Sequence, residues 1–281
     1  MNAKKKPSGT KAQVKSMKEK ERRTATAIFL AFILLIVVLS AYFTYTFLNQ
    51  PQNQPANPMS SQLKAAIVDQ LSLTFPNQSF IETATSTLER AGYNVDYYPG
   101  EMVTVDFYKS LAAHEYSLVI LRAHSALQQE DKPPVTLFTS EVYSRTKYVN
   151  EQLTDQLWEG ELGAGFVEGH TYFAISPGFV QHGIGGRFRD TVIIAMGCNG
   201  LTYTDMAEAF RMKGAKAYIS WNGSVSASHT DQATTLLLQH LVTTNETIEW
   251  AVDNTMKETG PDPTCNSQLS YYPSEAGGQY V

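Results

Sequence analysis

The stretch that most constrains the fold of this chain is TVIIAMGCNG, Thr191–Gly200. Its first half is apolar and rich in β-branched side chains, which is typical of a short strand buried on both faces of a sheet. The run then breaks into a turn in which glycines flank Cys198 and Asn199. In an open α/β sheet, functional groups gather at the carboxyl ends of the strands, so Cys198 is a candidate functional residue.

A second stretch has the same build. Ser117–Leu121, SLVIL, is another short apolar run, and it leads through Arg122 to His124. A thiol attacks a carbonyl only as a thiolate, and a nearby imidazole supplies the base that this requires. If the two strands are neighbours in one parallel sheet, His124 and Cys198 project from the same edge. We therefore expect a thiol–imidazole pair that the fold brings together across 74 positions of sequence.

Strand-like and helix-like segments alternate along the chain from residue 64 onward. Short apolar runs predict strands at 64–69, 94–98, 118–121 and 217–221. Helical spacing of apolar residues predicts helices at 80–91, 105–111, 205–213, from 228 onward and at 248–255. Such alternation predicts an α/β fold, a three-layer sandwich with a mainly parallel central sheet. Asp205 and Glu208 have the spacing of a capping box at the start of one helix.

Residues 126–190 interrupt this alternation. Residues 135–143 and 172–180 are typical of strands of mixed polarity, and glycines and prolines, such as Pro177-Gly178, punctuate the region. We expect a hairpin-rich insertion between the third and fourth parallel strands. The sequence leaves open whether this insertion forms a wall or lid over the site or is only a surface excursion.

The amino-terminal part differs in composition from the rest. Residues 1–23 carry nine Lys or Arg and two Glu, a net charge of +7, whereas the remaining residues carry −12. Residues 24–48 are uncharged and long enough for a transmembrane anchor, the alternative being a signal peptide with an unusually long apolar region. The charge asymmetry predicts a single-pass protein of the cell membrane, with residues 1–23 as a cytoplasmic tail and the carboxyl-terminal domain outside.

Two further inferences follow from composition. Residues 49–62, rich in Pro, Asn and Gln, predict a linker that holds the domain off the membrane. The acidic body has no basic clusters, which argues against nucleic acid as a partner.

Cys198 and Cys265 are the only cysteines in the chain. A disulfide between them is the alternative reading for an exported domain, although Cys265 lies in a Pro-rich part of a carboxyl-terminal tail, residues 261–281. His170 and His182 have no third metal ligand at a suggestive spacing, and no Gly-rich phosphate loop joins a strand to a helix. We therefore expect neither a metal nor a cofactor.

The strand before His124-Ser125 and the strand before Gly197-Cys198-Asn199-Gly200 together resemble those of caspase-like (clan CD) cysteine peptidases, and CHAT-type domains in particular. The resemblance extends downstream through a Gly-Ala turn, a strand that ends in Trp and an acidic residue ahead of the next helix, at Gly214-Ala215, Trp221 and Asp231. It implies a caspase-like domain over residues 63–260.

The resemblance also implies roles for individual residues. Cys198 would be the nucleophile, His124 the general base and acid, and the backbone amides of Ser125 and Cys198 the oxyanion donors. Ser125 departs from the glycine that is common at this position in caspases. Asp69 occupies the position at which several members have an acidic residue that binds a basic P1 side chain.

The sequence thus predicts a membrane-anchored, extracytoplasmic cysteine endopeptidase that acts on protein or peptide substrates with a Cys–His dyad. One alternative is a catalytically inactive binding or sensing module on the same scaffold, because a fold does not secure a function. A third reading is a doubly wound domain that binds a small ligand and merely packs Cys198.

Overall fold

The computed structural model describes residues 63–129, 132–161 and 170–281, together with Lys20, Arg23 and six residues between 33 and 40. Residues 60–281 form one compact unit. Most of the expected anchor, residues 24–48, lies outside the described residues. Within the described residues, no helix combines the length and the apolar composition needed to cross a bilayer.

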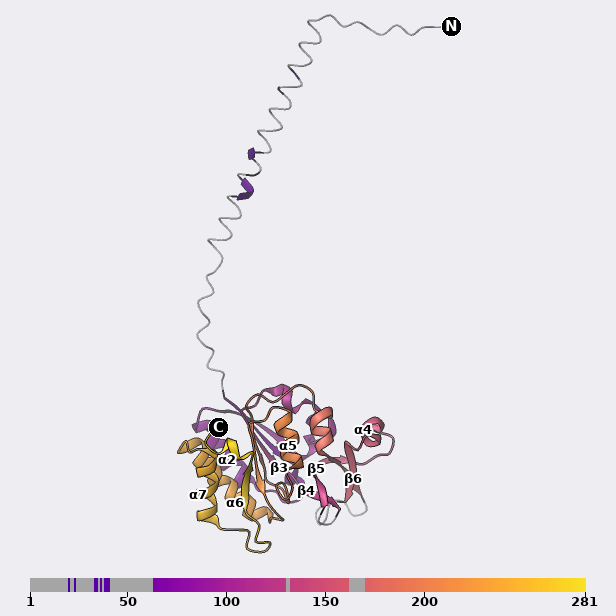
Figure 1. Cartoon of the computed structure of the whole chain (residues 1–281), viewed down its shortest axis with the longest axis vertical. Helices are drawn as coiled ribbons and strands as arrows, with labels where there is room; N and C mark the ends of the chain where they lie inside the picture. Colours follow the sequence, from indigo (N-terminus) through magenta and orange to yellow (C-terminus); the bar gives the residue numbers. More distant parts are fainter. Residues whose placement is uncertain are drawn as a thin grey trace, which may run out of the picture. The chain divides into compact units, whose positions relative to one another are not determined.

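In the described part of the chain, six strands form a mainly parallel sheet (Figure 1). They are β1 (Lys64–Asp69), β2 (Asn94–Pro99), β3 (Leu118–Arg122), β8 (Val192–Ala195), β9 (Ala217–Trp221) and β10 (Leu269–Tyr272). Their order across the sheet is β10-β9-β8-β3-β1-β2, and only β10 runs antiparallel to its neighbour. The predicted α/β class with a mainly parallel sheet is therefore confirmed.

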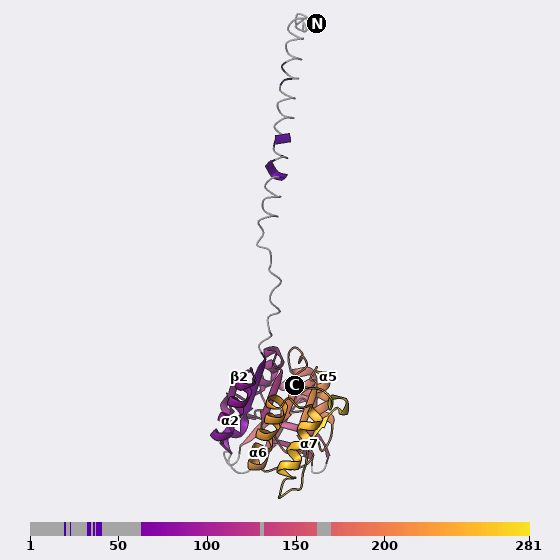
Figure 2. The same ribbon diagram turned by 90° about the vertical axis from the view of Figure 1, so that its left-hand side faces the viewer.

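Helices cover both faces of this sheet. Side chains alternate along the strands, so that Ile120 faces one hydrophobic cluster and Leu121 the other. The first cluster contains α2 (Gln78–Arg90), α6 (Ala227–Leu238) and α7 (Ile248–Thr259), and Figure 2 shows α6 between the other two. The second cluster contains α3 (Val105–Ser110) and α5 (Asp205–Met212).

The insertion forms a second sheet that belongs to the core. Among the described residues its four strands are antiparallel in the order β4-β5-β7-β6. They are β4 (Ser125–Gln129), β5 (Lys132–Val142), β6 (Leu157–Glu161) and β7 (Thr171–Ile175), with α4 (Val149–Leu153) between β5 and β6. Leu137 of β5 and Phe173 of β7 are buried in the cluster that contains α3 and α5. The insertion is therefore more than a surface excursion.

Two predicted segment boundaries differ from the structure. The strand expected at 172–180 ends at Ile175, because Pro177-Gly178 breaks it and a π-helical segment, η4 (Phe179–Gly183), follows. The sheet also extends beyond residue 260, since β10 lies in the segment that was expected to be a tail. The short sequence of β10, LSYY, gives too weak a pattern to predict a strand.

The capping box predicted at Asp205 and Glu208 is wrong. Thr204 is the N-cap residue of α5, and its side chain makes no capping bond. Asp205 instead accepts a hydrogen bond from Val135 N (3.0 Å), which ties α5 to the second sheet. Glu208 bonds to Arg211 and to Tyr272 of β10, so both carboxylates serve tertiary contacts rather than the helix end.

Candidate functional site

The fold brings His124 and Cys198 to the same edge of the sheet. β3 and β8 are parallel neighbours, and Leu121 pairs with Ala195 in their register. His124 lies three residues after Leu121, and Cys198 lies three residues after Ala195. Just beyond the paired strands, Met196 N donates to Leu121 O (2.9 Å). The two side chains therefore leave the sheet from equivalent positions at its carboxyl end.

Both residues line one cavity of about 280 Å³. Its walls come from the four segments that follow β1, β3, β8 and β9. Most of the lining is apolar, supplied by Leu71, Phe75, Ala123, Met196, Val225 and Ala227. Among the described residues, no histidine other than His124 contributes to this lining.

His124 is held on both its backbone and its side chain. Its backbone N–H donates to Gln70 Oε1 (2.9 Å), and its Nε2 lies 3.3 Å from Thr74 Oγ1. The ring of Phe75 meets the imidazole edge to face, with 6.0 Å between centroids. Burial, and secondarily the positive charge of Arg122, lower the pKa of His124 to about 4. The imidazole is therefore neutral at physiological pH, and its surroundings disfavour the protonated form.

The Cys198 thiol is partly exposed and contacts the backbone of the loop after β9. Its Sγ donates to Val225 O (3.5 Å) and accepts from Val225 N (3.4 Å). Asn199, in the left-handed region at φ 61°, turns the chain back so that its N–H donates to Gly223 O (2.8 Å). Cys198 and Cys265 are both free thiols, so the alternative disulfide is not formed.

The loops that carry the two residues touch each other at Ser125 and Gly197. Ser125 Oγ donates to the carbonyl oxygen of Cys198. A Cβ atom on Gly197 would lie 2.3 Å from Ser125 Oγ and 2.4 Å from Ala123 O, much closer than atoms can pack. Glycine is therefore required before Cys198 for the two loops to lie this close together.

A buried ion-pair cluster lies directly before the site in sequence. Arg122 is fully buried, and its guanidinium donates to Asp69 Oδ1 (2.7 Å) and to both carboxylate oxygens of Asp231 (2.7 and 2.8 Å). Its Nη2 also donates to Phe75 O (2.7 Å), which fixes the segment that faces His124. The cluster thus joins β1, β3 and α6 beneath the loops that form the cavity.

Asp69, the predicted substrate-binding residue, belongs to this cluster. Its side chain is 1% exposed, with one oxygen on Arg122 and the other accepting from Tyr97 OH (3.2 Å). Burial raises the pKa of Asp69, although the Arg122 guanidinium opposes that effect. Asp69 is not among the residues that line the cavity.

Sequence reasoning missed the role of Arg122 and the contacts of Thr74 and Gln70. One signal was available for Arg122, because a charged side chain inside a buried strand must find partners of opposite charge. Thr74 and Gln70 gave no such signal, since they act through a short 3-10 turn, η1 (Gln70–Leu73), and the residue after it.

The other histidines do not form a metal site. Among the described residues, no group of three or more His, Cys, Asp or Glu side chains could hold a metal ion. His229 of α6 is buried, and its Nε2 lies 3.2 Å from Gly260 O, with its ring against that of Trp221. Its contacts are those of a packed residue.

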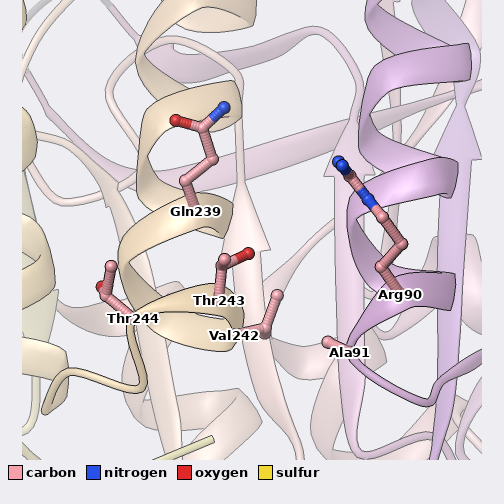
Figure 3. Close-up of a pocket in the computed structure, with 6 residues that line it drawn as sticks. All are labelled: Arg90, Ala91, Gln239, Val242, Thr243 and Thr244. Atoms are coloured by element: carbon pink, nitrogen blue, oxygen red, sulfur yellow. The ribbon is translucent and has the colours of Figure 1, made fainter.

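A second hollow, of about 430 Å³, lies between the end of α2 and the π-helical segment η5 (Gln239–Thr243). Figure 3 shows Arg90 and Ala91 on one side of it and four residues around η5 on the other. The α2 end leads into β2, whose first residue pairs with the first residue of β1. This hollow therefore lies at the amino ends of the strands, away from His124, and its lining includes neither a cysteine nor a histidine.

Comparisons of the chain with protein-family models and with curated proteins found no match. A functional assignment for this chain therefore depends on the geometry of its own residues.

Proposed function

We propose that this chain is a cysteine endopeptidase of the caspase-like type, with Cys198 as nucleophile and His124 as general base and acid. The observation that carries the proposal is the shared cavity: a thiol and a neutral imidazole leave adjacent parallel strands at equivalent positions and line the same 280 Å³ space. Nucleophile and base meeting in one concave, mostly apolar site is the arrangement that acyl transfer requires.

The reaction proceeds in two steps. Cys198 Sγ attacks the carbonyl carbon of the scissile peptide while His124 takes the thiol proton, and the carbonyl oxygen becomes an oxyanion. When the C–N bond breaks, His124 gives this proton to the leaving amine and a thioester remains. Water then attacks the thioester, and His124 passes a proton from the water to the sulfur as the acid product leaves.

The contacts of Thr74 hold the His124 ring in place. Thr74 Oγ1 donates to Leu71 O (3.5 Å) and lies 3.3 Å from His124 Nε2, where the ring tautomer decides which atom donates. Thr74 is in this proposal a positioning residue, because it acts on the substrate only through His124.

The oxyanion donors in the proposal are the backbone amides of Ser125 and Cys198. Two facts support this: Gly197 lets the two loops approach closely, and the Ser125 hydroxyl fastens them at Cys198 O. Backbone donors fixed before substrate arrives stabilise the developing charge without reorganising.

The cellular setting belongs to the same proposal. Residues 24–48 would anchor the chain in the membrane, with residues 1–23 in the cytoplasm and the catalytic domain outside. The uncharged 25-residue stretch after a tail of net charge +7 supports this orientation. We expect the protein to stay in the membrane fraction during alkaline extraction, and the carboxyl-terminal domain to be digested by protease added outside intact cells. Release of the protein from the membrane by alkali would contradict the proposal.

A non-catalytic binding module with the same fold is the second candidate. One observation favours it: the Cys198 sulfur is hydrogen bonded to both backbone groups of Val225, an arrangement that a merely packed thiol also makes. In that case the thiol should react with a neutral alkylating agent at pH 7 no faster than an ordinary cysteine.

The test is covalent labelling of the full-length chain in mild detergent with peptidyl acyloxymethyl ketones. We expect the label on Cys198, complete loss of labelling and peptide hydrolysis in Cys198→Ala, and retention of both in the matched variant Cys265→Ala. An unchanged melting temperature of Cys198→Ala would show that the loss is chemical. Labelling that maps to Cys265, or hydrolysis that survives in Cys198→Ala, would overturn the proposal.

A further inference from the structure

The walls of the cavity beside Cys198 are apolar and offer no free charge. Its side chains include Leu71, Phe75, Met196 and Val225, and Ala227 adds a methyl group at the start of α6. A volume of about 280 Å³ falls just under the roughly 300–1,000 Å³ of pockets that hold whole small ligands. It suits a single side chain of a longer substrate.

The polar groups of the lining are already committed within the protein. Thr230 Oγ1 accepts from Trp221 Nε1 (2.9 Å) and donates to Met196 O (3.0 Å). Ser226 Oγ donates to Asp262 Oδ2 (2.9 Å). Apart from the reacting pair, the site therefore offers an incoming side chain little but apolar contact.

The nearest carboxylates are committed as well. Asp69 and Asp231 are held by Arg122, and they are 1% and 4% exposed. Asp262 is 1% exposed and accepts from the backbone N–H groups of Ser226, Thr264 and Cys265. A Lys or Arg side chain entering the cavity would lose its hydration without gaining an ion pair.

An acidic side chain of a substrate would not gain an ion pair in the cavity either. Arg122 is the guanidinium nearest in sequence to the site, and it is fully buried between two carboxylates. Its positive charge is therefore compensated before substrate arrives, and it does not line the cavity.

We propose that this cavity is the P1 subsite of the enzyme and that it selects a large apolar side chain, of the size of Leu or Met. The inference rests on the proposed peptidase function and adds its substrate class. An apolar P1 preference differs from the basic preference expected from Asp69, because the Asp69 carboxylate is buried and bound to Arg122. Selection follows from filling the apolar walls and from the desolvation cost of any charged group.

The first experiment compares peptide substrates that differ only at P1, cleaved by the full-length chain in mild detergent. We expect kcat/KM for P1 Leu to exceed that for P1 Lys, Arg or Asp by about 100-fold or more, and that for P1 Ala by about tenfold. A preference for P1 Lys or Arg would overturn this inference alone and favour recognition by Asp69. Absence of both turnover and Cys198 labelling would overturn the proposed function and this inference together.

The second experiment places a charge in the cavity. Ala227→Asp adds a carboxylate at the first residue of α6, where the helix dipole tolerates it, and Ser228→Asp adds the same charge at the exposed neighbour outside the cavity. We expect Ala227→Asp to raise kcat/KM for P1 Lys relative to P1 Leu by about tenfold or more, with no such change in Ser228→Asp. An unchanged preference in Ala227→Asp would show that P1 does not enter this cavity and would overturn the proposal.

Discussion

Arg122 and His124 stand two residues apart at the carboxyl end of the same strand, and their surroundings differ in almost every physical property. The region of Arg122 is sealed and holds three ionisable groups in direct contact, Arg122 with Asp69 and Asp231. The region of His124 is a partly open cavity with apolar walls and an imidazole that is neutral at pH 7. One strand end thus carries both a structural site and a candidate reaction site.

The difference shows how charge is used in this molecule. Burying an ion pair is costly unless its geometry is good, and here every guanidinium nitrogen has a partner. The cluster orders the segment after β1 and, through its positive member, disfavours protonation of His124. The Arg122 cluster therefore influences the conformation and the pKa of the His124 region, although Arg122 and Asp69 do not line the cavity.

Removing Arg122 should have the largest effect. Arg122→Met leaves two buried carboxylates facing each other, so we expect the free energy of unfolding to fall by about 3–5 kcal/mol, measured by urea denaturation. The matched control is Arg189→Met, whose exposed ion pair with Glu115 should contribute at most about 1 kcal/mol. Equal stability of the two variants would show that the cluster does not hold the fold.

Gly197→Ala should damage the site more than the core. Its Cβ would force the loops of Ser125 and Cys198 apart, and we expect peptide hydrolysis to fall about 100-fold, a typical loss when one oxyanion donor is displaced. Overpacking should also lower stability by about 1–3 kcal/mol. Gly278→Ala, where a Cβ would meet nothing within 4 Å, is the control. Normal activity of Gly197→Ala would remove Ser125 from the proposed oxyanion site.

The pH profile should locate the pKa of His124. Because burial and Arg122 lower that pKa to about 4, the imidazole remains in its neutral form from pH 8 down to about 5. As pH falls through 4 the imidazole takes up a proton, and kcat/KM should decline about tenfold per pH unit. Circular dichroism over the same range would verify that the chain stays folded. An acid limb with its midpoint above pH 6 would mean that the imidazole is not shielded as the structure shows.

Thr74→Val should give the smallest effect. It removes the hydroxyl that lies 3.3 Å from Nε2 but keeps the shape of the side chain, and we expect kcat to fall about three- to tenfold with little change in KM, in line with the loss of one neutral hydrogen bond. Thr83→Val, on the exposed face of α2, is the control. A change confined to KM would indicate that Thr74 contacts substrate rather than orienting His124.

The sequence predicted the strand ends better than it predicted what surrounds them. The placement of His124 and Cys198 at neighbouring strand ends was predicted because each follows a short apolar run, a pattern that depends only on neighbours in the chain. Thr74 and Gln70 were missed because they reach His124 from about 50 positions away. Asp205 was misread because its spacing fits a helix cap, whereas tertiary packing assigns its carboxylate to Val135. A local sequence pattern predicts which residues lie at strand ends. Only the fold shows which polar side chains around them are already bound to other groups.

The backbone of His124 has a consequence for how the pair responds to substrate. Its N–H is fixed by Gln70 in η1, and its carbonyl accepts from Phe138 N (2.9 Å) in the antiparallel sheet, so the backbone of His124 is held on both sides. Cys198 reaches its contacts with Val225 through a side chain that turns about a single bond. In the proposed reaction the sulfur should therefore move while the imidazole stays in place, and alternative rotamers are to be sought on the cysteine.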